Sequence, residues 1–374
     1  MTRQTAKRSL LTAAVMAVFL WPAAPAFSME LVSEYSIPLK ADDRILGSLE
    51  GNYLVYGRPE ITMYNARGRA VFSRKLKNNV KPTLSPGGSV LGLITYADHS
   101  PTDLKTSKLE IFDQAGRLQW QMADPAANAF FITDKGAIFG IEGVEGIPPT
   151  RLHLYDQYGN LINILTFKDY NGLAISPAGG KFIIDRARAG LDVYDSTGEF
   201  LASLPVSEMY AFDRDQRYIG VFFEGIFRLF QDEKEVVLIK TQENTLRGLA
   251  INVEQNLLAM AGPNKLEVYE LTTKKLLWAY PLAEAGYKFT SLDISRDGQF
   301  IACGMDVNAG SLVAKELRHV EGHLLLFPRN GQTVTRKRET YQVWGVGLPK
   351  GVFSESGGSL VLQTREKLEK LRIR

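Results

Sequence analysis

Few residues in this sequence of 374 residues have the type and spacing that chemistry requires. His319 and His323 are four residues apart, which would place both rings on one side of a helix, as metal ligands are often spaced. However, His323 leads into an expected strand, and the pair has no obvious third ligand. The chain has only four histidines, so we expect solvated loop histidines here rather than a metal site.

Charged residues near the ends of expected strands are the second set of candidates. Arg186 and Arg188 lie close together, and Glu224 and Arg247 occupy neighbouring repeats of the pattern described below. Such charges could hold an anionic ligand or the acidic side chains of a partner, although solvated charged rims are common and are the favoured alternative. The candidate partner-binding or ligand-binding residues are His99, Asp103, Glu142, Arg186, Arg188, Glu224, Arg247, His319 and His323.

The cysteine count and the charge exclude several classes of protein. A single cysteine excludes an intramolecular disulfide, a cysteine-rich zinc site and the Cys-x-x-Cys-His pattern of haem attachment. No phosphate-binding loop, dinucleotide fingerprint or His-Glu-x-x-His helix is present. Three of the 44 basic residues, Arg3, Lys7 and Arg8, lie in an N-terminal segment without acids, so the rest of the chain has 41 residues of each sign. A neutral chain has no overall field that attracts nucleic acid or an anionic membrane.

The N-terminus has the three parts of a secretory signal. Residues 1–8 are basic, residues 10–21 are apolar, and small residues precede a cleavage site after Ala26. An uncleaved anchor is the alternative, but twelve apolar residues span only about 18 Å of a hydrocarbon core of about 30 Å. We therefore expect residues 1–26 to be removed and residues 27–374 to fold in the periplasm of a bacterium or outside the cell.

A four-residue pattern, apolar–x–apolar–aromatic, recurs along the chain at a mean spacing of about 44 residues. The alternation within each copy, with its β-branched and aromatic residues, predicts a strand. The copies end at Tyr64, Phe112, Tyr155, Tyr194, Phe230, Tyr269 and Phe327, with an imperfect eighth copy at residues 371–374.

Each copy is flanked by two turns, so the repeating unit is four strands, here called A to D. The A–B turn is of the type Ser295 to Gly298, and the C–D turn is of the type Asp113 to Gly116, where Asp opens the turn and Gly supplies the positive φ. Four antiparallel strands repeated at this spacing predict an all-β, single β-propeller with one blade per unit.

The turns predict eight blades, with seven as the main alternative and a two-domain layout as a less favoured one. The last unit ends after three strands, and residues 30–37 near the N-terminus read as the strand that completes it and closes the ring. The unit resembles the WD-repeat and pyrroloquinoline-quinone-like propeller families, in a Ser-Pro-x-Gly-like A–B turn and an Asp-x-x-Gly-x-Leu-x-Trp-like C–D segment. The Trp-Asp and Gly-His hallmarks of true WD repeats are missing, so the resemblance implies shape rather than membership.

The length variation lies in the B–C connections, at residues 97–103, 142–149 and 305–322. In a blade of this kind the B–C and D–A connections share one face, and loops longer than closure requires are often functional. The sequence therefore predicts a secreted or periplasmic, non-enzymatic propeller that binds a protein partner through this face, in a scaffold, docking or assembly role. We expect an envelope protein as the partner, a monomer, no cofactor, no nucleic acid and no membrane insertion after cleavage.

The resemblance also implies alternatives. The pyrroloquinoline-quinone-like group includes outer-membrane assembly lipoproteins, but this chain has no cysteine near the cut to carry a lipid. A quinone-dependent dehydrogenase is a second class, although quinoproteins commonly use a vicinal disulfide that one cysteine cannot form. A metal-dependent, lactonase-type hydrolase needs several oxygen ligands, and a binder of a small ligand or glycan is a further class. The candidate oxygen ligands are Asp98, Glu142, Asp185, Glu224 and Asp306.

Overall fold

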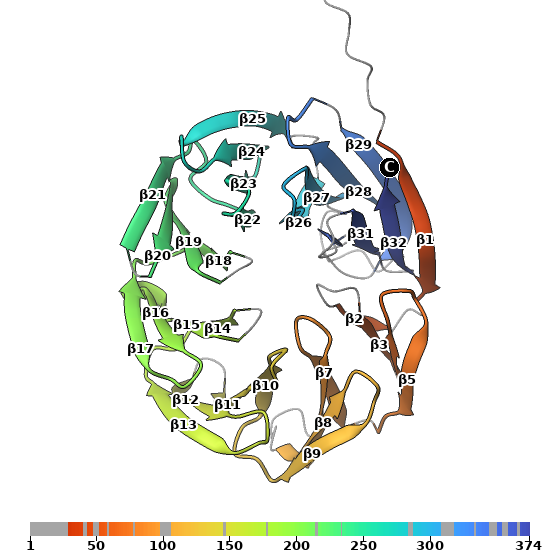
Figure 1. Cartoon of the computed structure of the whole chain (residues 1–374), viewed down its shortest axis with the longest axis vertical. Helices are drawn as coiled ribbons and strands as arrows, with labels where there is room; N and C mark the ends of the chain where they lie inside the picture. Colours follow the sequence, from red (N-terminus) through yellow and green to blue (C-terminus); the bar gives the residue numbers. More distant parts are fainter. Residues whose placement is uncertain are drawn as a thin grey trace, which may run out of the picture.

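The computed structural model is a ring of eight sheets, each with four antiparallel strands (Figure 1). The prediction of an eight-bladed propeller is confirmed, and the seven-bladed alternative is wrong. The structure describes residues 29–39, 43–47, 52–57, 60–77, 79–97, 106–144, 147–176, 179–213, 216–232, 234–282, 287–307, 318–332, 334–343, 350–353, 358–364 and 367–374.

Each blade runs from an inner strand beside the central channel to an outer strand at the rim (Figure 1). Blades 1 to 4 consist of β2 (Arg44–Gly47), β3 (Tyr53–Gly57), β4 (Glu60–Tyr64) and β5 (Ala70–Lys75); β6 (Val80–Leu84), β7 (Val90–Tyr96), β8 (Thr106–Asp113) and β9 (Leu118–Ala123); β10 (Ala129–Ile132), β11 (Ile138–Val144), β12 (Ile147–Tyr155) and β13 (Leu161–Phe167); and β14 (Gly172–Ile175), β15 (Lys181–Asp185), β16 (Leu191–Asp195) and β17 (Phe200–Leu204). Blades 5 to 8 consist of β18 (Met209–Phe212), β19 (Tyr218–Phe223), β20 (Ile226–Gln231) and β21 (Lys234–Lys240); β22 (Gly248–Asn252), β23 (Leu257–Ala261), β24 (Lys265–Glu270) and β25 (Lys275–Pro281); β26 (Tyr287–Ile294), β27 (Phe300–Val307), β28 (Arg318–Pro328) and β29 (Thr335–Val343); and β30 (Lys350–Phe353), β31 (Ser359–Gln363), β32 (Lys367–Ile373) and β1 (Leu31–Pro38). A 3-10 helix, η1 (Ala187–Ala189), lies between β15 and β16.

The N-terminal strand closes the ring, as the sequence predicted. β1 pairs antiparallel with β32 and is the outer strand of blade 8. Backbone hydrogen bonds of 3.0 and 2.9 Å between Glu30 and Arg374 extend this pairing to the end of the chain. Glu34 accepts hydrogen bonds from the side chains of both Lys370 and Arg372 on β32, which outweigh burial and lower the pKa of Glu34. Stitching both ends of the chain into one sheet leaves no unclosed gap in the ring.

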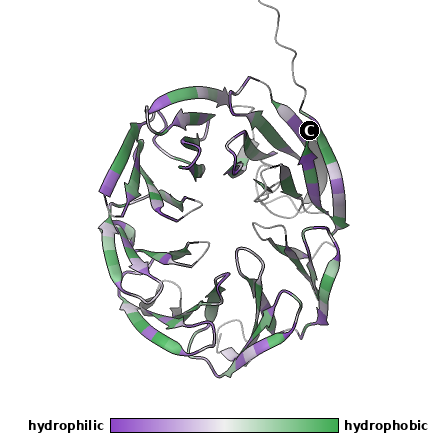
Figure 2. Cartoon of the chain, viewed as in Figure 1, coloured by the Kyte–Doolittle hydropathy of each residue, from purple (hydrophilic) through white to green (hydrophobic). Residues whose placement is uncertain are grey.

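The strand alternation directs apolar side chains into the spaces between blades, and Figure 2 shows that the strands of the blades are largely apolar. Val221 and Phe230 of blade 5, for example, pack with Val193 of blade 4 in one buried cluster. The last position of the four-residue pattern is aromatic in most blades, as with Phe327 of blade 7, which packs with Leu266 of blade 6. Burying a side chain of this size contributes about 1.5–3 kcal/mol, so the contacts between blades are a main source of stability.

The eighth copy of the four-residue pattern lies three residues earlier than the sequence indicated. In blade 2, Phe112 at the end of the copy pairs with Leu91, which follows the A–B turn. In blade 8 the residue paired in this way with Leu360 is Leu371. The copy is therefore residues 368–371 rather than 371–374, and it was misplaced because Lys370 and Leu371 stand where the other copies have an apolar and an aromatic residue.

Candidate functional site

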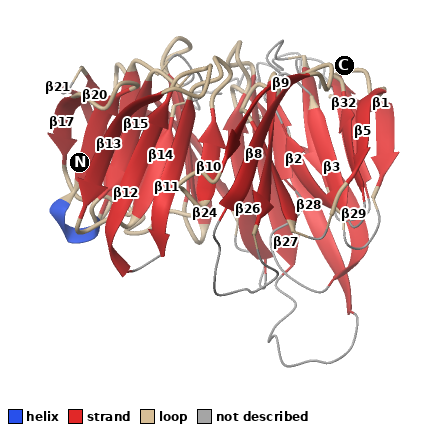
Figure 3. Cartoon of the chain, turned by 90° about the horizontal axis from the view of Figure 1, so that it is seen from below, coloured by secondary structure: helices blue, strands red, loops and turns tan. Residues whose placement is uncertain are grey.

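The two faces of the ring are built differently (Figure 3). We call the face of the A–B and C–D turns the turn face, and the face of the B–C and D–A connections the loop face. On the turn face, hydrogen bonds join neighbouring blades, as between blades 2 and 3. Gly87 N donates to Asp134 Oδ1 at 2.6 Å, and Trp120 Nε1 donates to Gln157 O at 2.7 Å. Such ties hold the turn face in one arrangement.

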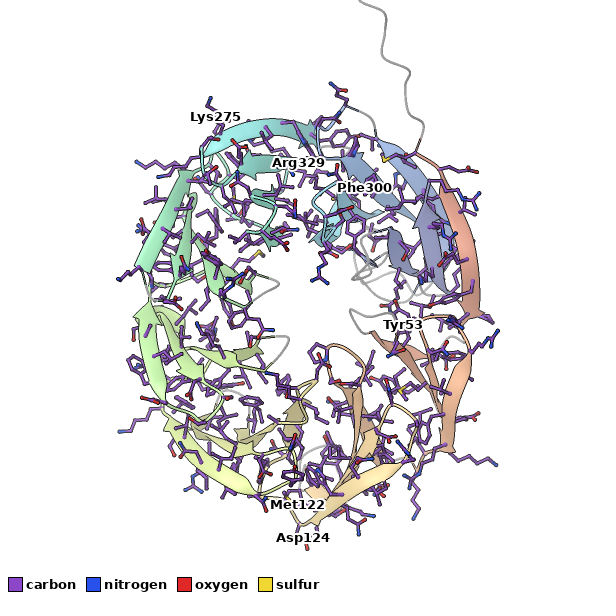
Figure 4. All side chains as sticks on the ribbon, viewed as in Figure 1. Tyr53, Met122, Asp124, Lys275, Phe300 and Arg329 are labelled. Carbon is purple, nitrogen blue, oxygen red and sulfur yellow. The ribbon has the colours of Figure 1, made fainter. Side chains whose placement is uncertain are left out.

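A tryptophan tie is repeated between blades 6 and 7. Trp278 Nε1 donates to the carbonyl oxygen of Arg329 at 2.8 Å, and Arg329 lies at the boundary between these blades in Figure 4. Both tryptophans lie on the strands that follow C–D turns, Trp120 on β9 and Trp278 on β25. Their indoles connect blades, so their role is structural.

The loop face carries the larger additions, although the described residues of two of them are largely strand rather than loop, residues 308–317 lying outside the described residues. β28 and β29 continue beyond β27 as a two-stranded projection, in which Arg318 pairs with Val343 (Figure 3). Residues 142–149 were expected to form a long loop, but Glu142 pairs with Arg151 and Val144 with Ile147, so this segment is a longer hairpin. The B–C connection at residues 97–103 lies outside the described residues apart from Ala97.

A pocket of about 280 Å³ opens on the loop face between blades 4 and 5. It lies where the apolar cluster between these blades reaches the surface, because Val221 belongs both to that cluster and to the pocket lining. Phe223 is 38% exposed, so an aromatic side chain at the pocket is open to a partner. The lining residues are Pro205, Val206, Val221, Phe223, Glu224, Ile226 and Arg228.

A tight turn positions Glu224 at the pocket. Glu224 and Gly225 connect β19 to β20, and both have positive φ values, of 45° and 77°. Two positive φ values in a two-residue connection are typical of the type I′ turn, whose twist matches that of paired strands. Thr241 N donates to Gly225 O at 2.9 Å and braces the turn against the next D–A connection. The carboxylate of Glu224 is thus held on a fixed support at the pocket.

The second charged group of the pocket is already paired. Arg228 lies on β20, and its Nη1 donates to Glu235 Oε2 on β21 at 2.7 Å. Both side chains are about one-third exposed, so water screens this ion pair. The pocket therefore offers an apolar surface, one guanidinium held by a carboxylate and one further carboxylate, that of Glu224.

Arg186 does not offer its charge to a ligand, because two carboxylates hold it. Its Nε and Nη2 donate to Asp169, and its Nη1 donates to Asp192 Oδ2 at 2.9 Å. The hydrogen bonds with Asp169, and then that with Asp192, raise the pKa of Arg186, and the same contact lowers the pKa of Asp169. Ser203 donates to the other oxygen of Asp192 at 2.6 Å. Arg186 thus joins the D–A connection to β16.

Glu142 is likewise used within its own blade. His153 Nε2 lies 2.7 Å from Glu142 Oε2, and Arg151 Nη1 lies 3.4 Å from Glu142 Oε1. His153 is buried, and its ring stacks at 6.3 Å on that of Tyr155. His153 is thus a buried residue on the face of its own blade.

The remaining predicted residues do not converge. His319 and His323 both lie on β28 rather than on a helix or in a loop, and four residues of strand span about 13 Å. His323 is fully buried, so it was wrongly expected to be solvated. Arg188 in η1 and Arg247 in the connection to β22 are exposed. His99 and Asp103 lie outside the described residues.

The described residues contain no group of three or more His, Cys, Asp or Glu side chains that could hold a metal ion. The pocket lining has no hydroxyl, thiol or imidazole, the groups that act as nucleophile or base in most hydrolases. Cys303 is fully buried, and burial raises its pKa to about 12, so it is an unreactive core thiol. The arrangement at the pocket can bind an apolar group, and it carries no catalytic constellation.

Sequence reasoning found Glu224 but missed the apolar residues around it. Phe223 precedes the turn and Val206 follows β17, and nothing in either segment marks it as exposed. Arg228 could have been singled out from the sequence, because it is a basic residue at the second position of the four-residue pattern. In several other copies this position holds an acid that is buried, such as Asp192 or Glu267.

Comparison with known proteins shows the fold. The chain is similar to the solved structure of BamB from Moraxella catarrhalis, with a TM-score of 0.58 and 13% identity over 92% of this chain and 100% of that one. It is also similar to the C-terminal WD40 domain of Sif2, with a TM-score of 0.55 and 11% identity over 92% of this chain and 98% of the other. A structure of the eukaryotic initiation factor has a TM-score of 0.52 and 12% identity over 84% of this chain and 91% of that one.

These likenesses establish a β-propeller of the kind seen in WD40 domains and BamB. No family model and no curated protein matches the sequence. Within the part of the chain that the structure describes, no helix has the length and apolar character needed to cross a membrane.

Proposed function

We propose that this chain is a non-enzymatic docking protein of the bacterial envelope, and that a protein partner binds its loop face. The pocket between blades 4 and 5 carries the proposal, because it combines an apolar surface with the exposed carboxylate of Glu224. Exposed aromatic rings beside apolar pockets are typical anchors of protein interfaces. We therefore expect the partner to insert a segment that has one bulky apolar side chain with a basic residue beside it. Glu224 would form an ion pair with that basic residue.

Site-specific crosslinking tests this proposal in the chain's own host. A photo-reactive phenylalanine analogue replaces Phe223 at the pocket or, as the control, Tyr158 on the turn face, which is 69% exposed. We expect one defined protein to crosslink at position 223 and not at position 158. Val206→Trp, which fills the pocket, should abolish that crosslink. Equal crosslinking at both positions, or an unchanged crosslink with Val206→Trp, would show that the partner does not use the pocket.

Affinity measurements with the identified partner separate the apolar and charged contributions. Truncation of an anchor in a protein interface typically costs about 2 kcal/mol or more, so Phe223→Ala should weaken binding by at least about 30-fold. Glu224→Gln keeps the size and removes the charge, and it should weaken binding by about 3-fold to 10-fold and reduce its salt dependence. Tyr158→Ala should bind as the wild type does.

The proposed location has a separate test. It is supported by the three-part N-terminal segment, and β1 begins only a few residues after the expected cut. The intact mass of the protein from the envelope fraction should correspond to residues 27–374. A protein that keeps residues 1–26 and fractionates with the cytoplasm would contradict the location but would leave the pocket proposal standing.

A further inference from the structure

The outer strand of blade 3 is an unusually apolar sheet edge. β13 is the last strand of its sheet, so no strand of the described chain pairs with its outer side. Its seven residues, Leu-Ile-Asn-Ile-Leu-Thr-Phe, include no charge and no proline. Leu161, Ile162 and Ile164 are 51%, 47% and 44% exposed. An exposed apolar edge of this kind is a template for pairing with another strand.

Most of the other outer strands are protected against such pairing. Each of β1, β5, β21, β25 and β29 contains at least one charged residue. Lys275 of β25 projects from the rim in Figure 4. β9 and β17 are also uncharged, but β9 contains two glutamines and β17 has only five residues. The uncharged part of the rim is therefore continuous over blades 2 to 4, with β13 at its centre.

Exposed apolar side chains gather on the same part of the rim. β13 presents Leu161, Ile162 and Ile164, more large exposed apolar residues than any other strand of the described chain. Leu118 on β9 and Phe200 on β17 flank it, at 49% and 52% exposure. Figure 2 shows β13 as a largely apolar stretch of the rim.

We propose that two copies of this chain associate through β13, as antiparallel strands related by a twofold axis at Ile164. In this register Ile164 faces its own copy, Leu161 faces Phe167 of the other copy, and Ile162 faces Thr166. No charge meets a like charge, and the exposed side chains of Leu161, Ile162 and Ile164 are covered. Seven paired residues give a contact about 24 Å long. The sequence favoured a monomer, and the exposed edge of β13 is the observation that changes this expectation.

β21 is the other outer strand that has seven residues and no proline, but its charges make it less suited to pairing with itself than β13. If β21 paired with itself about its centre, Lys234 would face Lys240 of the second copy, and like charges opposite one another destabilise a strand pair. β13 has no such conflict. An uncharged, self-compatible strand fits a second copy of itself better than a charged partner.

The backbone N–H of Ile164, at the centre of β13, can pair with a second copy at little cost in free energy. Ile164 N donates to the side-chain Oδ1 of Asn163, the preceding residue, at 2.8 Å. Strand pairing would exchange this local bond for one to the second copy, so the number of hydrogen bonds is kept. The gain then comes from burying the exposed side chains, and the association should be moderate and dependent on concentration.

Charge substitution at the axis tests the proposal. Ile164→Lys and Ile164→Glu each place two like charges opposite one another in the dimer, and each should raise its dissociation constant at least about 10-fold. An equal mixture of the two variants should restore association as a mixed dimer, because opposite charges then meet. Leu277→Lys, at a similarly exposed site on β25, is the matched control and should dimerise as the wild type does. Native mass spectrometry and sedimentation velocity measure the species.

The outcomes are distinct from those of the docking proposal, because β13 lies on the rim and not at the pocket. A wild-type chain that stays monomeric up to about 100 μM would overturn the dimer. So would an Ile164→Lys chain that dimerises normally, or a mixture with no mixed dimer. If the variants at Ile164 fail to fold, Ile162→Lys, at a site 47% exposed, tests the same edge and should weaken the dimer.

Discussion

A single glycine in a C–D turn shows how one residue can join two blades. Gly116 has a φ of +75°, and a β-carbon there would lie 2.1 Å from the ring of Phe72 in the preceding blade. Gly116→Ala would therefore combine an unfavourable backbone conformation with overpacking. We expect a loss of about 2–4 kcal/mol in the free energy of unfolding. Denaturant unfolding followed by tryptophan fluorescence measures this loss.

Gly358 provides the matched control for this substitution. It lies just before β31, and a β-carbon there would meet nothing within 4 Å. Gly358→Ala should change the stability by no more than about 0.5 kcal/mol. If Gly116→Ala were equally mild, the contact between the turn glycine and Phe72 would have no structural role.

At the residue scale the sequence predicts local conformation better than contacts. The Asp-x-x-Gly pattern correctly predicts turns with a positive φ, because that requirement is set within four residues. It does not predict that Phe72 fills the space beside Gly116, because this partner comes from another blade. For the same reason Arg186 looked available to a ligand, although Asp169 and Asp192 hold it.

At the scale of elements, period-two alternation identified the strands, but it could not set their ends. A loop was expected at residues 142–149 because Pro148 and Pro149 favour the end of a strand. The hairpin of β11 and β12 nevertheless includes these prolines. Proline is tolerated on a strand where its missing N–H is not needed by a neighbour. In blade 8 the four-residue pattern was predicted too late in the sequence, because Leu371 packs where an aromatic residue was expected.

A buried ion pair connects the outer strand of blade 7 to blade 8 and should make stability depend on pH. Burial alone would raise the pKa of Glu369 on β32, but hydrogen bonds from Lys337 of β29, Ser33 and Lys367 lower it below its usual value of 4.5. A carboxylate with a lowered pKa stabilises the fold above its unfolded pKa and loses this effect as the pH falls through its folded pKa. Glu369→Gln should therefore cost about 1–3 kcal/mol at pH 7 and much less near pH 3.

Urea unfolding of the two proteins at several pH values measures this difference. Glu235→Gln is the control, because its ion pair with Arg228 is about one-third exposed and within a single blade. That variant should change stability little at either pH. If the difference in the free energy of unfolding between the wild type and Glu369→Gln stayed constant down to pH 3, the carboxylate would not be stabilised by its lysines.

At the scale of the whole molecule, the repeat count and the closure of the ring followed from the sequence. The repeat count depends on the turns that recur along the chain, and the closure depends on the strand-like residues 30–37, which complete a last unit that ends after three strands. The pocket between blades 4 and 5 could not be predicted in this way, because its lining comes from β19, β20 and the connection after β17, which meet only in the folded ring. Repeats thus predict what the blades share, whereas binding sites arise where the blades differ.

Removing or moving the closing strand β1 tests how much this one element contributes to the stability of the whole ring. A chain that begins at Leu39 lacks β1, which leaves β32 as an open edge and removes the ion pairs of Glu34. It also removes Tyr35, whose ring fills the space beside Gly68 of blade 1. We expect this chain to unfold at least about 10 °C lower than a chain that begins at Met29, or to aggregate through the exposed edge.

Reattaching the strand at the other end distinguishes closure from simple shortening. Glu30 and Arg374 exchange backbone hydrogen bonds of 3.0 and 2.9 Å, so a two-residue Asn-Gly connection can join them. A chain that runs from Leu39 to Arg374 and then through residues 30–38 would rebuild blade 8 as a continuous hairpin. It should recover most of the lost melting temperature, as measured by circular dichroism. If it stayed as unstable as the shortened chain, β1 would stabilise the ring through something other than its place beside β32.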